Sequence, residues 1–169
     1  MEQKKGLHES EDLQFVFNRI FNTTTDATFK AWTDADQVAI WWGPKDFTNP
    51  VCKLDVRPGG KIHIDMTGPD GVVYPMGGTF HEVDTEQLVF TSTAFKDEQG
   101  NSALEVLNTV TFAEVNGKTK LRLQTNVVKA TPEAEEALTG MEDGWNQSLF
   151  KLQELLEKKP EDPNSESDQ

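Results

Sequence analysis

The chain has 169 residues, of which 27% are charged, and a formal net charge of −13 at pH 7. This length predicts one domain, and the acidic balance argues against a nucleic-acid partner, because phosphate binding needs a basic surface. No apolar run approaches the ~18–20 residues of a membrane-spanning helix, and the single cysteine, Cys52, excludes an intrachain disulfide. We therefore expect a cytoplasmic protein, and a monomer, since no heptad repeat indicates an interface.

Both ends of the sequence are polar and are predicted to be disordered tails. Residues 1–12 read MEQKKGLHESED and residues 159–169 read KPEDPNSESDQ, and neither segment has enough apolar side chains to form a core. The single folded domain is therefore expected to span residues 13–158.

The first part of this domain changes its hydrophobic period. Residues 13–22, LQFVFNRIFN, are rich in aromatic and β-branched side chains, which predicts a strand. Residues 23–44 then show a helical period with Thr and Asp at the starts, which predicts two short helices. Gly43 and Pro44 are expected to end the second helix.

Residues 51–128 alternate between strand patterns and turns. The segment KIHIDM alternates apolar with polar side chains, so one face of this strand is expected to be buried. Pro75 and the glycine pair after it favour an edge, a bulge or a bend over a flat central strand. Asn116 and Gly117 favour a two-residue hairpin turn. The region therefore predicts roughly six antiparallel strands.

The segment 131–158 has the signature of one long helix. Thr131 and Pro132 suit its first positions, and apolar residues follow at three- and four-residue steps to form one stripe. A sheet with one apolar face needs a cover, and this stripe is the largest one available. The order of elements therefore predicts an α+β fold in which the last helix covers the sheet.

Five segments of the chain, taken in order, resemble one known family. They are AWTDADQVAIWWGP (31–44), DVRPGGKIHIDMTGPDG (55–71), GGTFHEVDTEQLVFTS (77–92), TVTFAEVNGKTKL (109–121) and GMEDGWNQSLFKL (140–152). Together they are similar to the family named after the heat-shock protein 90 ATPase activator homologue, in the START and birch-pollen-allergen superfamily (SRPBCC). The resemblance covers nearly everything between Leu13 and Leu156.

This resemblance implies the helix-grip fold, in which a curved antiparallel sheet wraps around a long C-terminal helix and two short helices follow the first strand. Relatives in the superfamily commonly keep a cavity between sheet and helix. In that setting Gly144 would let the helix backbone approach the sheet or leave room for a ligand, and Trp145 would fill or line the cavity. Either role would account for the glycine, which destabilises a helix interior by about 1 kcal/mol relative to alanine.

Catalytic and metal-ligating patterns are weak in this sequence. His8 lies in the N-terminal tail, His63 shares a strand face with charged neighbours, and His81 and Glu82 are adjacent on a strand and so point to opposite faces. No histidine pair has metal-ligand spacing, and Cys52 alone cannot build a thiolate site. We therefore expect no catalytic residue, no metal and no cofactor.

Large apolar side chains are the better candidates for a binding site, because ligand pockets are mostly apolar and aromatic. The alternative for any one of them is simple packing of the core. Arg19, in register with the phenylalanines of the first strand, and Glu82, in register with Phe80, are candidate polar anchors; a structural ion pair or a charge that reaches water is the alternative. The candidate cavity residues are Phe29, Trp32, Trp41, Trp42, Ile64, Met66, Met76, Phe80, Phe90, Met141, Trp145 and Leu149.

Three functions follow from these observations. The first is non-catalytic binding of a hydrophobic small molecule, lipid-like or aromatic, between the sheet and the last helix, which requires a cavity larger than a water molecule. The second, implied by the family name, is a co-chaperone that activates the heat-shock protein 90 ATPase, although 169 residues leave no room for the N-terminal domain of the eukaryotic activator. The third is a cyclase or aromatase that would use Arg19, Tyr74, His81 and Glu82.

Overall fold

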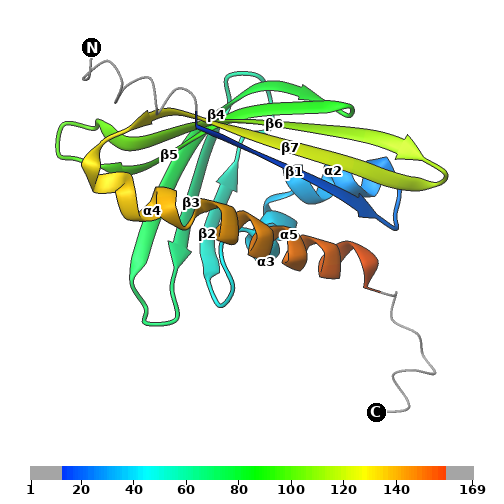
Figure 1. Ribbon diagram of the computed structural model, residues 1–169, viewed down its shortest axis with the longest axis horizontal. Helices are drawn as coiled ribbons and strands as arrows, with labels where there is room; N and C mark the ends of the chain where they lie inside the picture. The colour runs from blue at the N-terminus through cyan, green and yellow to red at the C-terminus, as the bar shows by residue number, and fades with distance from the viewer. Residues whose placement is uncertain (1–12, 159–169) are drawn as a thin grey trace.

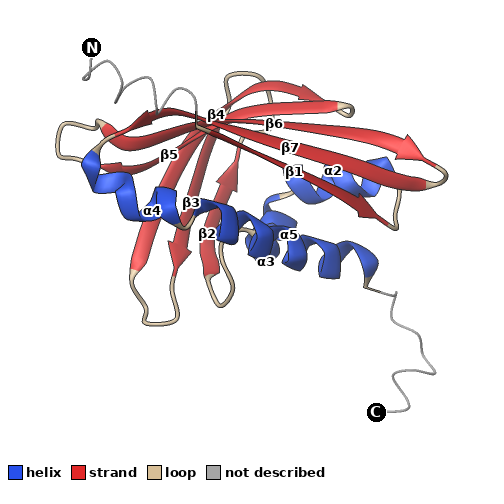
Figure 2. Ribbon diagram, viewed as in Figure 1, coloured by secondary structure: helices blue, strands red, loops and turns tan. Residues whose placement is uncertain are grey.

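The computed structural model describes residues 13–158, so the predicted tails lie outside it (Figure 1). One antiparallel sheet has the strand order β1-β7-β6-β5-β4-β3-β2, and it curves around the helix α5 (Figures 1 and 2). The α+β helix-grip prediction is confirmed. The strands are β1 (Gln14–Phe21), β2 (Thr48–Leu54), β3 (Lys61–Thr67), β4 (Val73–Asp84), β5 (Gln87–Lys96), β6 (Ser102–Val115) and β7 (Lys118–Ala130). The helices are α2 (Thr25–Thr33), α3 (Ala35–Trp41), a 3-10 turn (Pro132–Ala134), α4 (Glu135–Thr139) and α5 (Met141–Glu157).

The two short helices α2 and α3 each have their own start signal. The side-chain oxygen of Thr24 accepts a hydrogen bond from Ala27 N at 3.1 Å and caps α2. Asp34, in an extended conformation, ends α2 and precedes α3. At the end of α3, the buried Trp41 donates from Nε1 to the Ala31 carbonyl oxygen at 2.9 Å. This hydrogen bond ties the two helices together on the sheet.

The RPGG loop between β2 and β3 holds a core residue in place. Gly59 N donates to the Phe80 carbonyl oxygen at 2.7 Å, and Phe80 N donates to the Gly60 carbonyl oxygen at 2.9 Å. A Cβ on Gly60 would lie 1.7 Å from the carbonyl oxygen of Asp55, so the turn requires glycine there. The loop connects β2 to β3, and its two hydrogen bonds hold Phe80 in the core.

Strand β4 contains an irregularity, but it lies after Phe80, whereas the register is regular at the glycine pair where the sequence suggested a bulge or bend. Its register with β5 shifts: Phe80 pairs with Phe90, but Glu82 pairs with Val89. One extra residue in β4 therefore turns Glu82 to the face opposite Phe80. The prediction that Glu82 and Phe80 share a face is wrong. Glu82 is exposed, and it accepts a hydrogen bond from Gln87 Nε2 at 2.8 Å.

The C-terminal segment is divided, and the prediction of one long helix from Thr131 is wrong. At Gly140 the backbone leaves helical geometry (φ −95°, ψ 5°), and α5 begins after it. At Gly144 the helix is regular, with Gly144 N donating to the Gly140 carbonyl oxygen at 2.9 Å. A Cβ on Gly144 would meet, among the described residues, only Pro44 Cγ at 3.9 Å. The expected close approach of Gly144 to the sheet is therefore also wrong.

The inner face of the sheet carries two apolar clusters. The main cluster includes Trp32 from α2 and Leu149 from α5, together with side chains of all seven strands. The second cluster surrounds Val106 and Val127, and Met141 packs against it from the start of α5. Among residues 13–158, no helix is both long enough and apolar enough to cross a membrane.

Candidate functional site

All four tryptophans of the chain lie in the main cluster. The ring of Trp32 is 4.6 Å from that of Trp41 and 6.1 Å from that of Trp145, measured between centroids. Trp145 is nearly parallel to Trp32, at 22°, and Trp42 meets Trp145 edge-on at 5.4 Å. Such aromatic pairs contribute about 0.5–1.5 kcal/mol each beyond the area that they bury. Trp145 therefore fills the space between sheet and helix.

A small apolar cavity adjoins these rings. Its volume is about 20 Å³, which is close to the room that one water molecule needs. The prediction of a cavity larger than a water molecule is therefore not met, because side chains fill the space. None of the lining side chains titrates, so the walls offer packing and no acid–base group. The lining residues are Trp32, Val38, Trp41, Trp42, Leu54, Ile62, Ile64, Met76, Phe80 and Phe90.

Most of the predicted cavity residues line this cavity, and five lie elsewhere. Phe29 packs edge-on against Phe112 at 5.7 Å, and Met141 belongs to the second cluster. Met66, Trp145 and Leu149 pack in the main cluster without lining the cavity.

Sequence reasoning did not single out three of the lining residues. Ile62 alternates with Ile64 in β3, and this period could have identified it. Val38 lies one helical turn before Trp41 in α3, which is a weaker signal. Leu54, at the end of β2, has no pattern that sets it apart.

Among residues 13–158, the buried indole nitrogen that has no hydrogen-bond partner belongs to Trp32. Its Nε1 is buried and has no acceptor among residues 13–158. Trp41, by contrast, donates to a backbone carbonyl. A buried donor without a partner costs about 1–3 kcal/mol. An acceptor supplied by another molecule would therefore be stabilising at Trp32.

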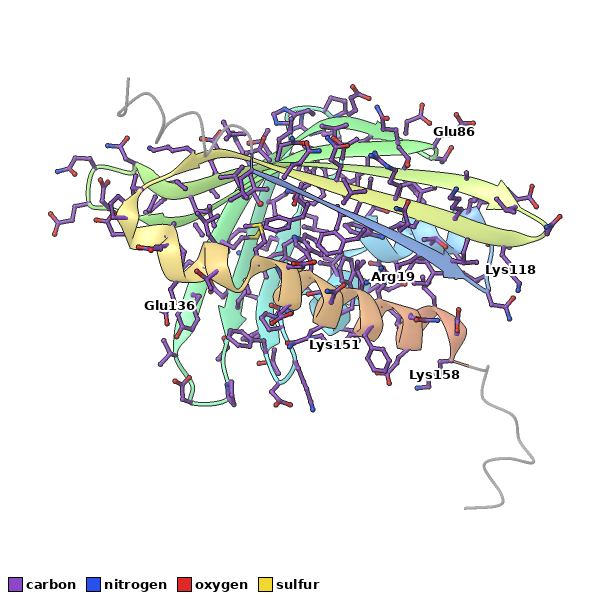
Figure 3. The ribbon with its side chains drawn as sticks, in the orientation of Figure 1. Arg19, Glu86, Lys118, Glu136, Lys151 and Lys158 are labelled. Atoms are coloured by element: carbon purple, nitrogen blue, oxygen red, sulfur yellow. The ribbon has the colours of Figure 1, made fainter. Side chains whose placement is uncertain are left out.

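Arg19 lies on the face of β1 that carries Phe17 and Phe21, as predicted, and it points toward α5 (Figure 3). Its guanidinium donates to Asn146 Oδ1 on that helix. It cannot pair with Glu82, which lies on the other face of the sheet. Arg19 is therefore a link between the edge strand β1 and α5.

The two halves of α5 are held differently. In the second half Leu149 and Leu152 are buried, and the buried Ser148 donates from Oγ to the Gly43 carbonyl oxygen at 2.8 Å. Lys151 Nζ donates to the Pro44 carbonyl oxygen at 3.1 Å. The first half contributes only half-buried side chains, and α4 has no buried residue. The half that carries Trp145 is therefore the less buried one, and the Arg19–Asn146 hydrogen bond joins it to β1.

The histidines that the structure describes lie outside the cavity. His63 Nε2 is 2.9 Å from Asp65 Oδ1, and His81 Nε2 is 2.6 Å from Thr91 Oγ1; both imidazoles are exposed. Within residues 13–158 no three His, Cys, Asp or Glu side chains gather as a metal site would require. His8 lies outside the described residues.

The curved sheet and the long helix that it grips define a helix-grip domain. A family model described as Activator of Hsp90 ATPase homolog 1-like protein matches residues 22–157, and the chain belongs to this family.

Solved structures share the fold along nearly the whole chain. A protein from Mycobacterium smegmatis is 26% identical, with a TM-score of 0.73 over 91% of this chain and 96% of that one. A protein from Arthrobacter aurescens is 23% identical, with a TM-score of 0.76 over 89% of each chain. The AHSA1 protein from Silicibacter pomeroyi is 24% identical, with a TM-score of 0.71 over 85% of this chain and 97% of that one. A search of curated proteins gives no match.

Proposed function

We propose that this protein binds a flat apolar small molecule, without catalysis, at the position that the Trp145 ring occupies. The observation that carries the proposal is the buried Trp32 Nε1, which lies in an apolar aromatic site and has no acceptor among the described residues. A guest with a carbonyl or ether oxygen would supply that acceptor. The lining side chains carry no acid or base, which supports binding without chemistry.

The guest needs more room than the cavity provides. Pockets for small molecules measure about 300–1,000 Å³, whereas this cavity measures about 20 Å³. The half-buried Trp145 lies beside Trp32, with 6.1 Å between ring centroids, so a bicyclic guest in its place would also lie beside Trp32. Its oxygen must reach the plane of the Trp32 ring, because the indole N–H points outward in that plane. Movement of the first half of α5 would release the ring while Ser148 and Lys151 keep the second half in place.

The proposal is tested by calorimetric titration of 2-acetylnaphthalene into the wild type and Trp145→Ala. The variant should bind the probe at least about tenfold more tightly, because the guest no longer has to expel a ring, and about 1.4 kcal/mol corresponds to each tenfold change. Its own stability should fall by about 3 kcal/mol. Phe150→Ala, at an exposed position of the same helix, is the control and should change neither quantity. Weaker binding by Trp145→Ala would contradict the proposal, since Trp145 would then be a wall of the site.

Activation of the heat-shock protein 90 ATPase is a second proposal, favoured by the description of the family whose model matches residues 22–157. It predicts a higher rate of ATP turnover when this protein is added to the chaperone of the same organism. An unchanged turnover rate at saturating protein would exclude it.

A further inference from the structure

A row of two buried polar side chains, Asn108 and Thr125, lies on the inner face of the sheet. Asn108 of β6 is the register partner of Thr125 of β7 and of Phe90 of β5. Its Nδ2 donates to Ser92 Oγ at 3.1 Å and to the Phe90 carbonyl oxygen at 3.3 Å. Asn108 is 1% exposed and Thr125 is fully buried. Because Phe90 lines the cavity, this row begins one strand away from the cavity wall.

The row separates the two apolar clusters. On one side of it, Val110 and Leu123 belong to the main cluster. On the other side, Val106 and Val127 belong to the second cluster. Polar side chains at the centre of an apolar face are costly unless each of their atoms is hydrogen-bonded.

Two atoms of this row lack that hydrogen bond. Asn108 Oδ1 and Thr125 Oγ1 are buried and have no partner within the described part of the chain. The amide oxygen can only accept, whereas the hydroxyl can donate and accept. A hydroxyl group placed between them could donate a hydrogen bond to Asn108 Oδ1 and accept one from Thr125 Oγ1.

The first turns of helix α5 span the two clusters. Met141 packs against the second cluster and Trp145 against the main cluster. Residues four positions apart lie one above the other on a helix, so the turn between Met141 and Trp145 faces the boundary between the clusters. Displacement of the Trp145 ring would therefore uncover the polar row as well as the Trp32 indole.

We propose that Asn108 and Thr125 bind a hydroxyl group of the guest. The proposal rests on the proposed binding function and specifies its ligand. The ligand class is a flat apolar molecule with a carbonyl-type acceptor at one end, for Trp32, and a hydroxyl group at the other end, for the polar row.

The test compares two probes that differ only in the hydroxyl group, 6-acetyl-2-naphthol and 2-acetylnaphthalene, by calorimetric titration. The wild type should bind the hydroxylated probe about tenfold more tightly, as a buried hydrogen bond predicts. Thr125→Val, which keeps the shape of the side chain, should abolish this preference. Thr125→Ser should keep the preference. Thr111→Val, on the opposite face of β6, is the matched control.

Each result decides one of the two proposals. If both probes bind the wild type equally, or if Thr125→Val keeps the preference, the hydroxyl site is excluded and the binding function stands. If neither probe binds the wild type up to its solubility limit, the binding function fails and the hydroxyl site fails with it. Thr125→Ala provides a second variant without the hydroxyl group, in case Thr125→Val does not fold, and the same preference is measured on it.

Discussion

Two glycines of this chain are required because other backbone lies against them. A Cβ on Gly60 would lie 1.7 Å from the carbonyl oxygen of Asp55, and one on Gly78 would lie 2.1 Å from that of Thr91. Real side chains do not approach backbone so closely, so any substitution must separate the paired segments. Gly144 differs from both, because its hypothetical Cβ makes an ordinary contact.

This difference predicts opposite effects of the same substitution. Gly144→Ala should raise the free energy of unfolding by about 1 kcal/mol, because alanine is the better helix former and the site has room for a methyl group. Gly78→Ala should lower it by about 3 kcal/mol or more, because the methyl group would push β4 away from β5. Urea denaturation of both variants measures the two changes. A destabilised Gly144→Ala would show that its bare backbone has a role that packing does not reveal.

The thiol of Cys52 on β2 is controlled by its surroundings. Burial, together with the negative charges of Asp36 and Asp34, raises the pKa of Cys52 to about 11. Only the thiolate attacks an aromatic disulfide reagent. The folded protein should therefore react at least about tenfold more slowly than the unfolded chain at pH 8, and its rate should rise toward pH 11. A folded rate equal to the unfolded one would contradict this pKa.

The raised pKa of Cys52 also makes the stability of the folded state depend on pH. The folded pKa of Cys52 lies above the ordinary value of 9.0, so the folded state holds the thiol proton more strongly between pH 9 and about 11. This contribution to stability is complete below that window and falls as the pH rises through it. Cys52→Ser should show a smaller loss of stability between those pH values.

At the scale of elements, the C-terminal segment consists of two parts that differ in how much they bury against the rest of the protein. The second half of α5 is fixed by the side chains of Ser148, Leu149 and Leu152, whereas α4 and the first turns of α5 bury little. Few buried contacts predict low local stability. Backbone amides of residues 135–146 should therefore exchange with deuterium at least about tenfold faster than those of 149–156, as followed by NMR. Equal protection in both halves would mean that the helix opens as one unit.

Local patterns predicted most of these elements, and non-local pairing accounts for the exceptions. Asn116 and Gly117 have φ values of 53° and 81° and form the expected hairpin turn, because that turn needs only its own two residues. The bulge that turns Glu82 outward depends on which residue of β5 it pairs with, and strand alternation alone cannot show this. The helical period continues through both Gly140 and Gly144, so the sequence does not indicate where the helix breaks.

At the scale of the whole molecule, residue type predicted which side chains gather in the core but not how completely they fill it. Trp32, Phe80 and Phe90 were predictable because large apolar side chains are buried. The volume that remains depends on packing at the scale of single methyl groups, which no sequence pattern reports. Asn108 and Thr125 resemble ordinary strand residues, and only the register of β6 with β7 places them side by side.

The most direct test of the proposed binding site is the ¹H–¹⁵N NMR spectrum of the four tryptophan indole groups during titration with 2-acetylnaphthalene. Trp32→Phe assigns the decisive signal. We predict a saturable downfield shift of the Trp32 indole proton, which gains an acceptor, and a change at Trp145, whose ring leaves the cluster. Trp41 should move least, since it already donates to a carbonyl. The isosteric 2-isopropylnaphthalene, which lacks the oxygen, should change Trp145 without the downfield shift at Trp32. A Trp32 signal that stays in place while other signals titrate would contradict the account.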